Sequence, residues 1–148
     1  MRVMMIMIAT AILAACATPP QPVAVENTRT YDLPKDVVWE RLLDFFTSQS
    51  IPIKTIEKDS GVVYAERAGF SPGQADCGAS LLNEMSRMAS LNVFVRQMGG
   101  ETQVTVNTAF NVVRSYDRQV WTAECYSTGL IERQILQSIA AAPGKPAA

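Results

Sequence analysis

The 148-residue sequence contains no histidine, and this absence removes several classes of catalytic and metal site at once. A Ser-His-Asp triad, a Cys-His pair and any His-containing metal site all need an imidazole. Neither charge is in large excess, since 13 Lys and Arg side chains oppose 14 Asp and Glu side chains. This balance gives no electrostatic basis for binding nucleic acid or anionic lipid headgroups. We therefore expect no enzyme activity, no metal and no nucleic-acid partner.

The sequence also lacks an apolar run long enough to span a membrane as a helix. Its longest such run, from Val3 to Ala15, is shorter than the roughly 20 residues that a spanning helix needs. One cation, Arg2, precedes this run, and small residues end it. A basic start, a short apolar segment and small residues at the end are typical of a secretory signal peptide. Residues 1–15 are therefore expected to be removed from the mature protein.

The end of the apolar run, Leu13-Ala14-Ala15-Cys16, resembles the lipobox of bacterial lipoproteins. In that family the cysteine sulfur receives a diacylglycerol, the chain is cut before the cysteine, and the new amine is acylated, commonly with palmitate. The resemblance implies that Cys16 is the lipidated first residue of the mature protein, which its acyl chains hold stably on a membrane. Ala17 at the next position implies the outer membrane of the cell envelope, facing the periplasm. The alternative is an ordinary signal peptide that ends in a chance cysteine.

Three segments follow the cleavage point. Residues 16–26 contain three prolines and are expected to form the lipidated cysteine and an extended tether. The ten tether residues 17–26 would hold the domain about 30 Å from the bilayer. Residues 27–141 carry helix and strand patterns and are long enough for one domain with its own core. Residues 142–148, with two prolines and a glycine, are expected to be a disordered tail.

Only two cysteines, Cys77 and Cys125, remain beyond Cys16. In an oxidising periplasm two such cysteines usually form a disulfide, here across 48 residues. Two buried thiols are the alternative.

Hydrophobic periodicity predicts the fold. Residues 35–49 form the clearest amphipathic helix, with an apolar stripe and three acidic residues on the other side. Residues 89–98 and 101–112 form a hairpin around Gly99-Gly100, a turn that needs positive φ at both positions. In that register opposing residue numbers sum to 199, so Val95 faces Val104 and Val93 faces Val106 on one apolar face.

The remaining elements complete an α+β fold. Strands are expected at residues 28–33, 52–57, 62–67 and 119–123, and a long loop at residues 68–87. A helix capped by Ser127 or Thr128 is expected at residues 129–140. The order is β-α-β-β-β-β-(β)-α. This order predicts a single antiparallel sheet of four to six strands with two helices packed on one face.

Two patterns that suggest catalysis have simpler interpretations. Gly69-Phe70-Ser71-Pro72-Gly73 matches the nucleophile-elbow pattern, but Pro72 lacks the N–H that an oxyanion hole needs, and no histidine can act as base. Asp36, Glu40 and Asp44 form an acidic row at helical spacing that could bind Ca²⁺ or perform acid–base chemistry. We interpret the first as a loop and the second as a solvated helix face.

A polar turn at residues 114–118 mixes arginines with aromatic residues. Arg114, Tyr116, Arg118 and Trp121 are residue types that are enriched at interface hot spots, so they are candidates for a partner-binding patch. Ordinary turn residues and core aromatics are the alternative. Met85 and Met88 are expected to fill gaps in the core.

The stretch Tyr31–Ala65 and the C-terminal region resemble the helix-grip domains of BamC, an accessory lipoprotein of the outer-membrane β-barrel assembly machine. They also resemble a wider set of small envelope lipoproteins. The similar motifs are Val38-Trp39 in a helix, Ile51-Pro-Ile-Lys, Lys58-Asp-Ser-Gly61-Val-Val, the Cys77 loop and the Cys-x-Ser-Thr-Gly-x-x-Glu pattern at Cys125–Glu132. The resemblance implies no catalytic residues. BamC carries two such domains on a long tether, whereas this chain has one domain on a short tether.

The sequence supports two functions. The first is a non-enzymatic, membrane-anchored module facing the periplasm, an accessory subunit of an envelope assembly with a protein partner. The second is a carrier of a small ligand or lipid, because a helix across a curved sheet can enclose a pocket. A large apolar cavity beneath residues 39–46 would favour the carrier, and a filled core would favour the interaction module. The sequence does not determine the oligomeric state.

Overall fold

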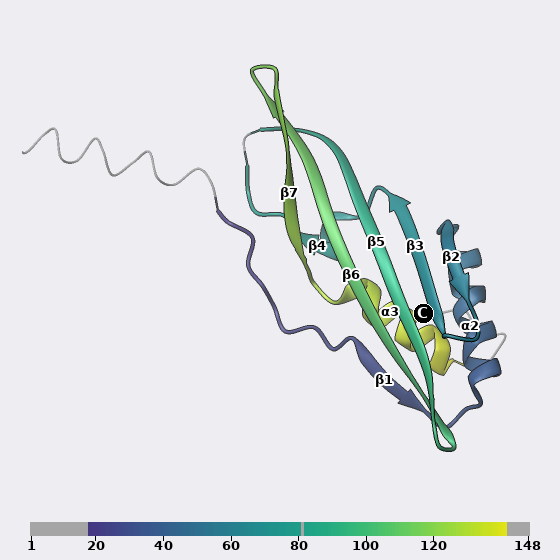
Figure 1. Ribbon diagram of the computed structural model, residues 1–148. Coiled ribbons are helices and arrows are strands. Elements are labelled where there is room, and N and C mark those ends of the chain that lie inside the picture. The colour runs from purple at the N-terminus through teal and green to yellow at the C-terminus, as the bar shows by residue number, and fades with distance from the viewer. Residues whose placement is uncertain (1–17, 81, 142–148) are drawn as a thin grey trace, which may run out of the picture.

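The computed structural model describes residues 18–80 and 82–141, which form an α+β domain with one antiparallel seven-stranded sheet (Figure 1). The predicted fold class is confirmed, with seven strands in place of four to six. Both helices lie on the same face of the sheet, so the opposite face has no covering layer among the described residues. We call these the core face and the outer face.

The elements follow the expected order with one addition. Their bounds are β1 Thr28–Tyr31, α2 Lys35–Ser48, β2 Ile53–Glu57, β3 Val62–Ala68, a 3-10 turn at Pro72–Gln74, β4 Ala75–Asp76, β5 Asn83–Met98, β6 Glu101–Tyr116, β7 Gln119–Ser127 and α3 Leu130–Ala140. The strands are hydrogen-bonded in the order β2-β3-β5-β6-β7-β4, and β1 pairs with β6 beyond the reach of β7.

The central hairpin has the predicted register. Val95 lies opposite Val104 and Val93 opposite Val106, and all four side chains are buried on the core face. Because successive side chains of a strand point to opposite faces, the mostly polar residues that alternate with the apolar ones lie on the outer face, as in a half-buried sheet. The turn differs from the prediction, because only Gly99 has positive φ, at 62°, and Gly100 does not. This pattern is that of a type II′ turn, in which one position alone needs the freedom of glycine.

Both helices pack their apolar stripes on the core face. Trp39, Leu42 and Phe46 of α2 are buried, and Ile135 and Ile139 of α3 meet the same core. A hydrogen bond also joins the two helices. Arg41 of α2 donates a hydrogen bond to the Ile139 carbonyl at the end of α3. A cation at this position satisfies a carbonyl that has no partner within its own helix.

Several predicted strand boundaries are wrong at one end of the sheet. There, the strands continue beyond the residues that show an apolar pattern. The expected loop at 68–87 contains the 3-10 turn, the short strand β4 and the first residues of β5. The strand β6 continues to Tyr116, so the turn expected at 114–118 shrinks to Asp117 and Arg118, both with positive φ. These extensions are mostly exposed and mix polar residues with Met85, Met88 and Tyr116, so their apolar periodicity is weak. Backbone pairing with a neighbouring strand sustains them.

Two further expectations are corrected by the structure. Met85 and Met88 are exposed rather than buried in the core. The cap of α3 is Gly129, with φ 78°, rather than Ser127 or Thr128. Ser127 contributes differently, because its hydroxyl accepts a hydrogen bond from the Gly129 N–H.

Residues 18–26 differ from the expected tether, because they lie against the domain instead of standing away from it. Thr18 pairs with Ala79, and the Gln21 N–H donates to the Asp76 carboxylate at 2.9 Å. The segment then continues to β1 along one side of the sheet (Figure 1). These hydrogen bonds hold the segment on the domain.

The expected signal peptide at 1–15, the lipidated Cys16 and the expected disordered tail at 142–148 lie outside the described residues. Neither of the two helices described has both the length and the hydropathy that crossing a bilayer demands.

Candidate functional site

The disulfide predicted from the sequence is confirmed and organises one end of the domain. Cys77 and Cys125 are bonded, with their Cα atoms 4.3 Å apart. Cys125 belongs to β7, opposite the buried Phe110 of β6, and Cys77 directly follows β4. The bond therefore holds the segment after β4 against the sheet. We call residues 76–80 the disulfide loop.

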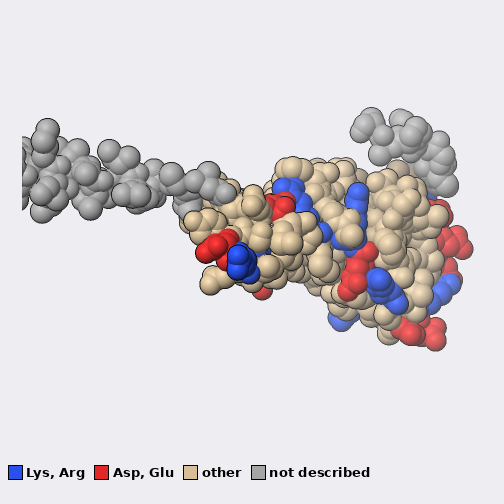
Figure 2. All heavy atoms as spheres, turned by 90° about the horizontal axis from the view of Figure 1, so that it is seen from above, with Lys and Arg blue, Asp and Glu red and all other residues tan. Residues whose placement is uncertain are grey.

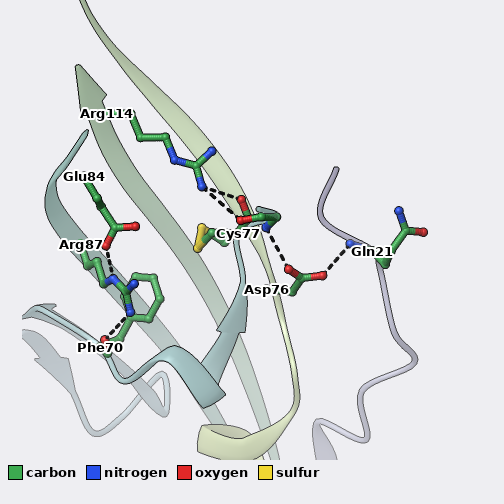
Figure 3. The surroundings of a disulfide bond; sticks show 9 residues. Gln21, Phe70, Asp76, Cys77, Glu84, Arg87 and Arg114 are labelled. Atoms are coloured by element: carbon green, nitrogen blue, oxygen red, sulfur yellow. Dashed lines mark hydrogen bonds and ion pairs between the residues drawn. A yellow bond between two sulfur atoms is a disulfide. The ribbon is translucent and has the colours of Figure 1, made fainter. Parts of the chain in front are cut away.

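Asp76 connects the disulfide loop to the N-terminal segment (Figure 3). Its carboxylate accepts hydrogen bonds from two backbone groups, the Gln21 N–H at 2.9 Å and the Gly78 N–H at 2.9 Å. These hydrogen bonds, first that of Gln21 and then that of Gly78, lower the pKa of Asp76 below its ordinary value. The charged carboxylate is thus the form that holds the segment in place.

Gly78 allows the N-terminal segment to approach the loop closely. Its φ is 68°, and a Cβ atom there would lie 2.4 Å from the Thr18 carbonyl oxygen and 2.9 Å from the Pro20 nitrogen. Both neighbours are backbone atoms, which cannot move aside cheaply. The Thr18 oxygen also accepts a hydrogen bond from the Ala79 N–H at 3.0 Å. The contact between residues 18–20 and the loop therefore depends on a glycine.

Arg114 holds the disulfide loop from the other side. Its guanidinium donates hydrogen bonds to the Cys77 carbonyl at 2.7 Å and to the Gly78 carbonyl at 3.4 Å (Figure 3). Arg114 lies opposite Trp121 of β7 and Glu84 of β5. Sequence reasoning placed Arg114 in a partner-binding patch, and the structure shows that its side chain makes intramolecular contacts.

The other three residues of that patch lie at the end of the β6–β7 hairpin, where they are exposed. Tyr116 is 68% exposed, Trp121 is 36% exposed, and Arg118 occupies the turn with φ 66°. Val120, at 60%, and Met85, at 62%, add apolar surface at the same end. The hairpin extends beyond the helices, so no element of the core packs over its tip (Figure 1). We call Met85, Tyr116, Val120 and Trp121 the hairpin end.

Arg87 of β5 and Phe70 form a second set of contacts near this end of the sheet. The guanidinium of Arg87 lies over the Phe70 ring, 5.3 Å from its centroid, and forms an ion pair with Glu84. Phe70 also packs edge-on against Phe110, at 5.0 Å between centroids. The segment that carries the G-x-S-x-G pattern is thereby fixed to the core face. Ser71 is exposed and its N–H donates to Gln74, so it begins the 3-10 turn.

Glu132 is a buried acidic residue whose role the sequence did not predict. It lies in the first turn of α3 and is only 2% exposed. Its Oε1 accepts hydrogen bonds from the hydroxyls of Thr108 on β6, at 2.5 Å, and Ser127 on β7, at 2.6 Å. Its Oε2 has no hydrogen-bond partner among the described residues. An acidic residue near the start of a helix was visible in the sequence, but its burial was not.

The acidic row on α2 is a solvated helix face. Asp36, Glu40 and Asp44 are all exposed, and Asp36 pairs with Lys58 at 2.8 Å. The hydrogen bond from Lys58 and its charge lower the pKa of Asp36. Within residues 18–80 and 82–141, no three His, Cys, Asp or Glu side chains are grouped so that they could hold a metal ion.

Between the helices and the sheet, side chains fill the space. The cavity at this interface, lined by residues that include Ile51, Leu91, Phe110 and Ile131, has a volume of about 10 Å³. That is room for about one water molecule, whereas ligand pockets measure about 300–1,000 Å³.

The outer face of the sheet has a wider, open hollow of about 270 Å³. Its lining is one half-buried aromatic ring among polar side chains of β5 and β6: Phe94, Arg96, Gln103, Thr105 and Asn107. The ring of Phe94 therefore lies in a hollow on a mostly polar face of the sheet.

No family model matches this chain, and no curated protein matches it either.

Proposed function

We propose that this protein is a lipid-anchored, non-enzymatic interaction module in a bacterial cell envelope, held by acyl chains on Cys16 and facing the periplasm. The anchor is inferred from the signal-peptide pattern and from Leu13-Ala14-Ala15-Cys16. A role as an accessory subunit of an envelope assembly, with the outer membrane as its site, accords with the similarity of its motifs to BamC-type lipoproteins.

The observation that carries the interaction role is the contrast between the two faces of the sheet. The core face is covered by two helices and packed, whereas the outer face bears an open hollow around Phe94. An uncovered face that combines an aromatic ring with hydrogen-bonding side chains suits a protein partner. The small volume of the helix–sheet cavity argues against the carrier function, because a ligand there would have to displace packed side chains.

Site-specific photocrosslinking tests the proposal directly. A photoreactive amino acid at Asn107, in the outer-face hollow, is compared with one at Glu40, on the exposed acidic side of α2. We expect Asn107 to give a discrete adduct with one envelope protein, identified by mass spectrometry, and Glu40 to give none. The adduct should disappear in Cys16→Ser, because that variant lacks the membrane anchor.

Two other results would contradict the proposal. Mass spectrometry of membrane-extracted protein that shows an unmodified Cys16 would remove the anchor. Absence of any adduct at Asn107, together with a lipid or small molecule that co-purifies with both the wild type and Cys16→Ser, would support the carrier function instead.

A further inference from the structure

The position of Thr18 determines which end of the domain is nearest to Cys16. The Thr18 carbonyl accepts a hydrogen bond from Ala79 in the disulfide loop, and Gln21 is held by Asp76. Two residues span at most about 7 Å, whatever their conformation. A lipid on Cys16 would bring the bilayer surface to this end of the domain.

The hairpin end lies beside the same loop. Arg114 links them, since its guanidinium binds the Cys77 and Gly78 carbonyls while its backbone pairs with Trp121. Beyond Trp121 the hairpin continues to Val120 and Tyr116. The N-terminal segment and Arg114, the strand neighbour of Trp121, thus both bind this loop, and the disulfide joins the loop to β7.

The chemistry of the hairpin end fits a lipid interface. Tryptophan and tyrosine prefer the boundary between headgroups and acyl chains, where an apolar ring and a polar N–H or O–H are both satisfied. Arg118 at the turn can keep its charged group among the headgroups while its methylenes lie lower. Figure 2 looks down on this end of the molecule and shows mainly uncharged atoms there, with a few Lys, Arg, Asp and Glu side chains among them.

From these observations we propose that the hairpin end, Met85, Tyr116, Val120 and Trp121, inserts into the interfacial layer of the lipid bilayer next to the acylated Cys16. This inference rests on the proposed lipid anchor. It assigns a lipid surface as the partner of Tyr116, Arg118 and Trp121. The domain would then stand in one orientation on the membrane, and the outer face of the sheet would remain accessible from the side.

The two tryptophans of the chain provide a built-in test. Trp39 is 4% exposed in the core, whereas Trp121 is 36% exposed at the hairpin end. The full lipidated protein is reconstituted into vesicles of phosphatidylethanolamine and phosphatidylglycerol with brominated acyl chains, which quench nearby indoles. In Trp39→Phe, where Trp121 is the sole reporter, we expect a blue-shifted and quenched emission. In Trp121→Phe, the emission of Trp39 should be unaffected by bromination. If Trp39→Phe does not fold, the difference between the wild type and Trp121→Phe gives the same measurement.

A pair of glycine variants tests the role of the docked segment. Gly78→Ala introduces a methyl group 2.4 Å from the Thr18 oxygen, and we expect it to release the segment and reduce the quenching of Trp121. Gly69→Ala is the matched control. Gly69 also has positive φ, at 83°, so alanine suffers comparable backbone strain, but a Cβ there meets nothing within 4 Å. Gly69→Ala should retain the quenching.

The outcomes separate this inference from the anchor on which it rests. A protein with acylated Cys16 that floats with the vesicles, but in which Trp121 is not quenched, overturns the inference and leaves the anchor standing. Quenching of Trp121 that is equal in Gly78→Ala and Gly69→Ala also overturns it, because orientation would not then depend on the docked segment. An unmodified Cys16 overturns both. A photocrosslinker at Tyr116 that captures a protein rather than lipid assigns the hairpin end to that protein and overturns the inference alone.

Discussion

Glu132 shows how a single buried carboxylate joins three elements. Its Oε1 accepts hydrogen bonds from Thr108 of β6 and Ser127 of β7, while its own backbone lies in α3. Ser127 in turn accepts the Gly129 N–H at 3.0 Å. The start of α3 is thereby tied to two strands by polar contacts inside the core. Such a network stabilises only if its donors remain satisfied.

Removing the acceptor should therefore be costly, and removing only the charge should not. We expect Glu132→Leu to lower the free energy of unfolding by about 1–3 kcal/mol, because the hydroxyls of Thr108 and Ser127 lose their shared acceptor in a buried site. Glu132→Gln keeps an oxygen in that position and should stay within about 1 kcal/mol of the wild type. Urea unfolding of both variants measures the difference. Equal losses in the two variants would mean that the charge matters rather than the acceptor.

Asp76 makes the docking of the N-terminal segment dependent on pH. Its pKa is lowered by the Gln21 and Gly78 N–H groups, so the docked state favours the carboxylate. The contribution is therefore fully present above the ordinary pKa of about 3.9 and is lost as the pH falls through the lowered value. We expect the amide resonances of Gln21 and Gly78 to titrate together below the ordinary value in NMR spectra recorded from pH 6 to pH 2.5.

The control is Asp76→Asn, which retains an acceptor oxygen but cannot titrate. In this variant neither amide resonance should follow the low-pH transition. Two amides that titrate in the wild type at an ordinary aspartate pKa would show that the carboxylate does not hold the segment.

At the scale of elements, the disulfide secures β4 and the loop after it to β7. The strand β4 has only two residues and pairs with β7 at Tyr126 and Ser127, so its backbone hydrogen bonds alone are few. Reducing the bond between Cys77 and Cys125, or replacing both by alanine, should destabilise the domain by up to about 4 kcal/mol, the chain-entropy value for a 48-residue separation.

Urea unfolding of the Cys16→Ser protein with and without reductant measures this loss without interference from the lipid. We also expect the amide of Ala79 to exchange faster in the reduced protein, since its acceptor on Thr18 depends on the loop. A reduced protein as stable as the oxidised one would show that core packing alone holds this end together.

Element bounds were predictable wherever one face is buried. The register of β5 and β6 followed from valines that alternate along both strands, because a shift of one residue would move them all to the outer face. The same argument has no force for the start of β5 and the end of β6, where most side chains on both faces are exposed or only partly buried. There, main-chain pairing extends the strands without leaving a pattern in the side chains.

For the molecule as a whole, the order of strands in the sheet predicts that resistance to local unfolding differs from strand to strand. The strands β5 and β6 have neighbours on both sides and lie beneath the helices, while β2 and β4 are at the two ends of the sheet. We expect native-state hydrogen exchange to be slowest in the middle of β5 and β6, near Val93 and Val106, and to approach the global free energy of unfolding there. The amides of β2 and β4 should exchange through local opening. Equal protection in all strands would indicate that the sheet opens only as a unit.

The sequence by itself determined the class of fold, the disulfide pair, the amphipathic helix and the absence of histidine chemistry. Each of these depends on residue type or on local periodicity, which are properties of the chain before it folds. The central hairpin register belongs to the same group, because apolar side chains on two adjacent segments must reach one core.

Tertiary structure alone decided the rest. The carboxylate of Glu132 is buried only because β6 and β7 bring two hydroxyls to it, and Arg114 is a structural residue only because a loop 36 residues away presents its carbonyls. The N-terminal segment lies on the domain because Gly78 leaves room for its backbone and Asp76 binds it. Contacts between distant segments create these features, and no local pattern encodes them.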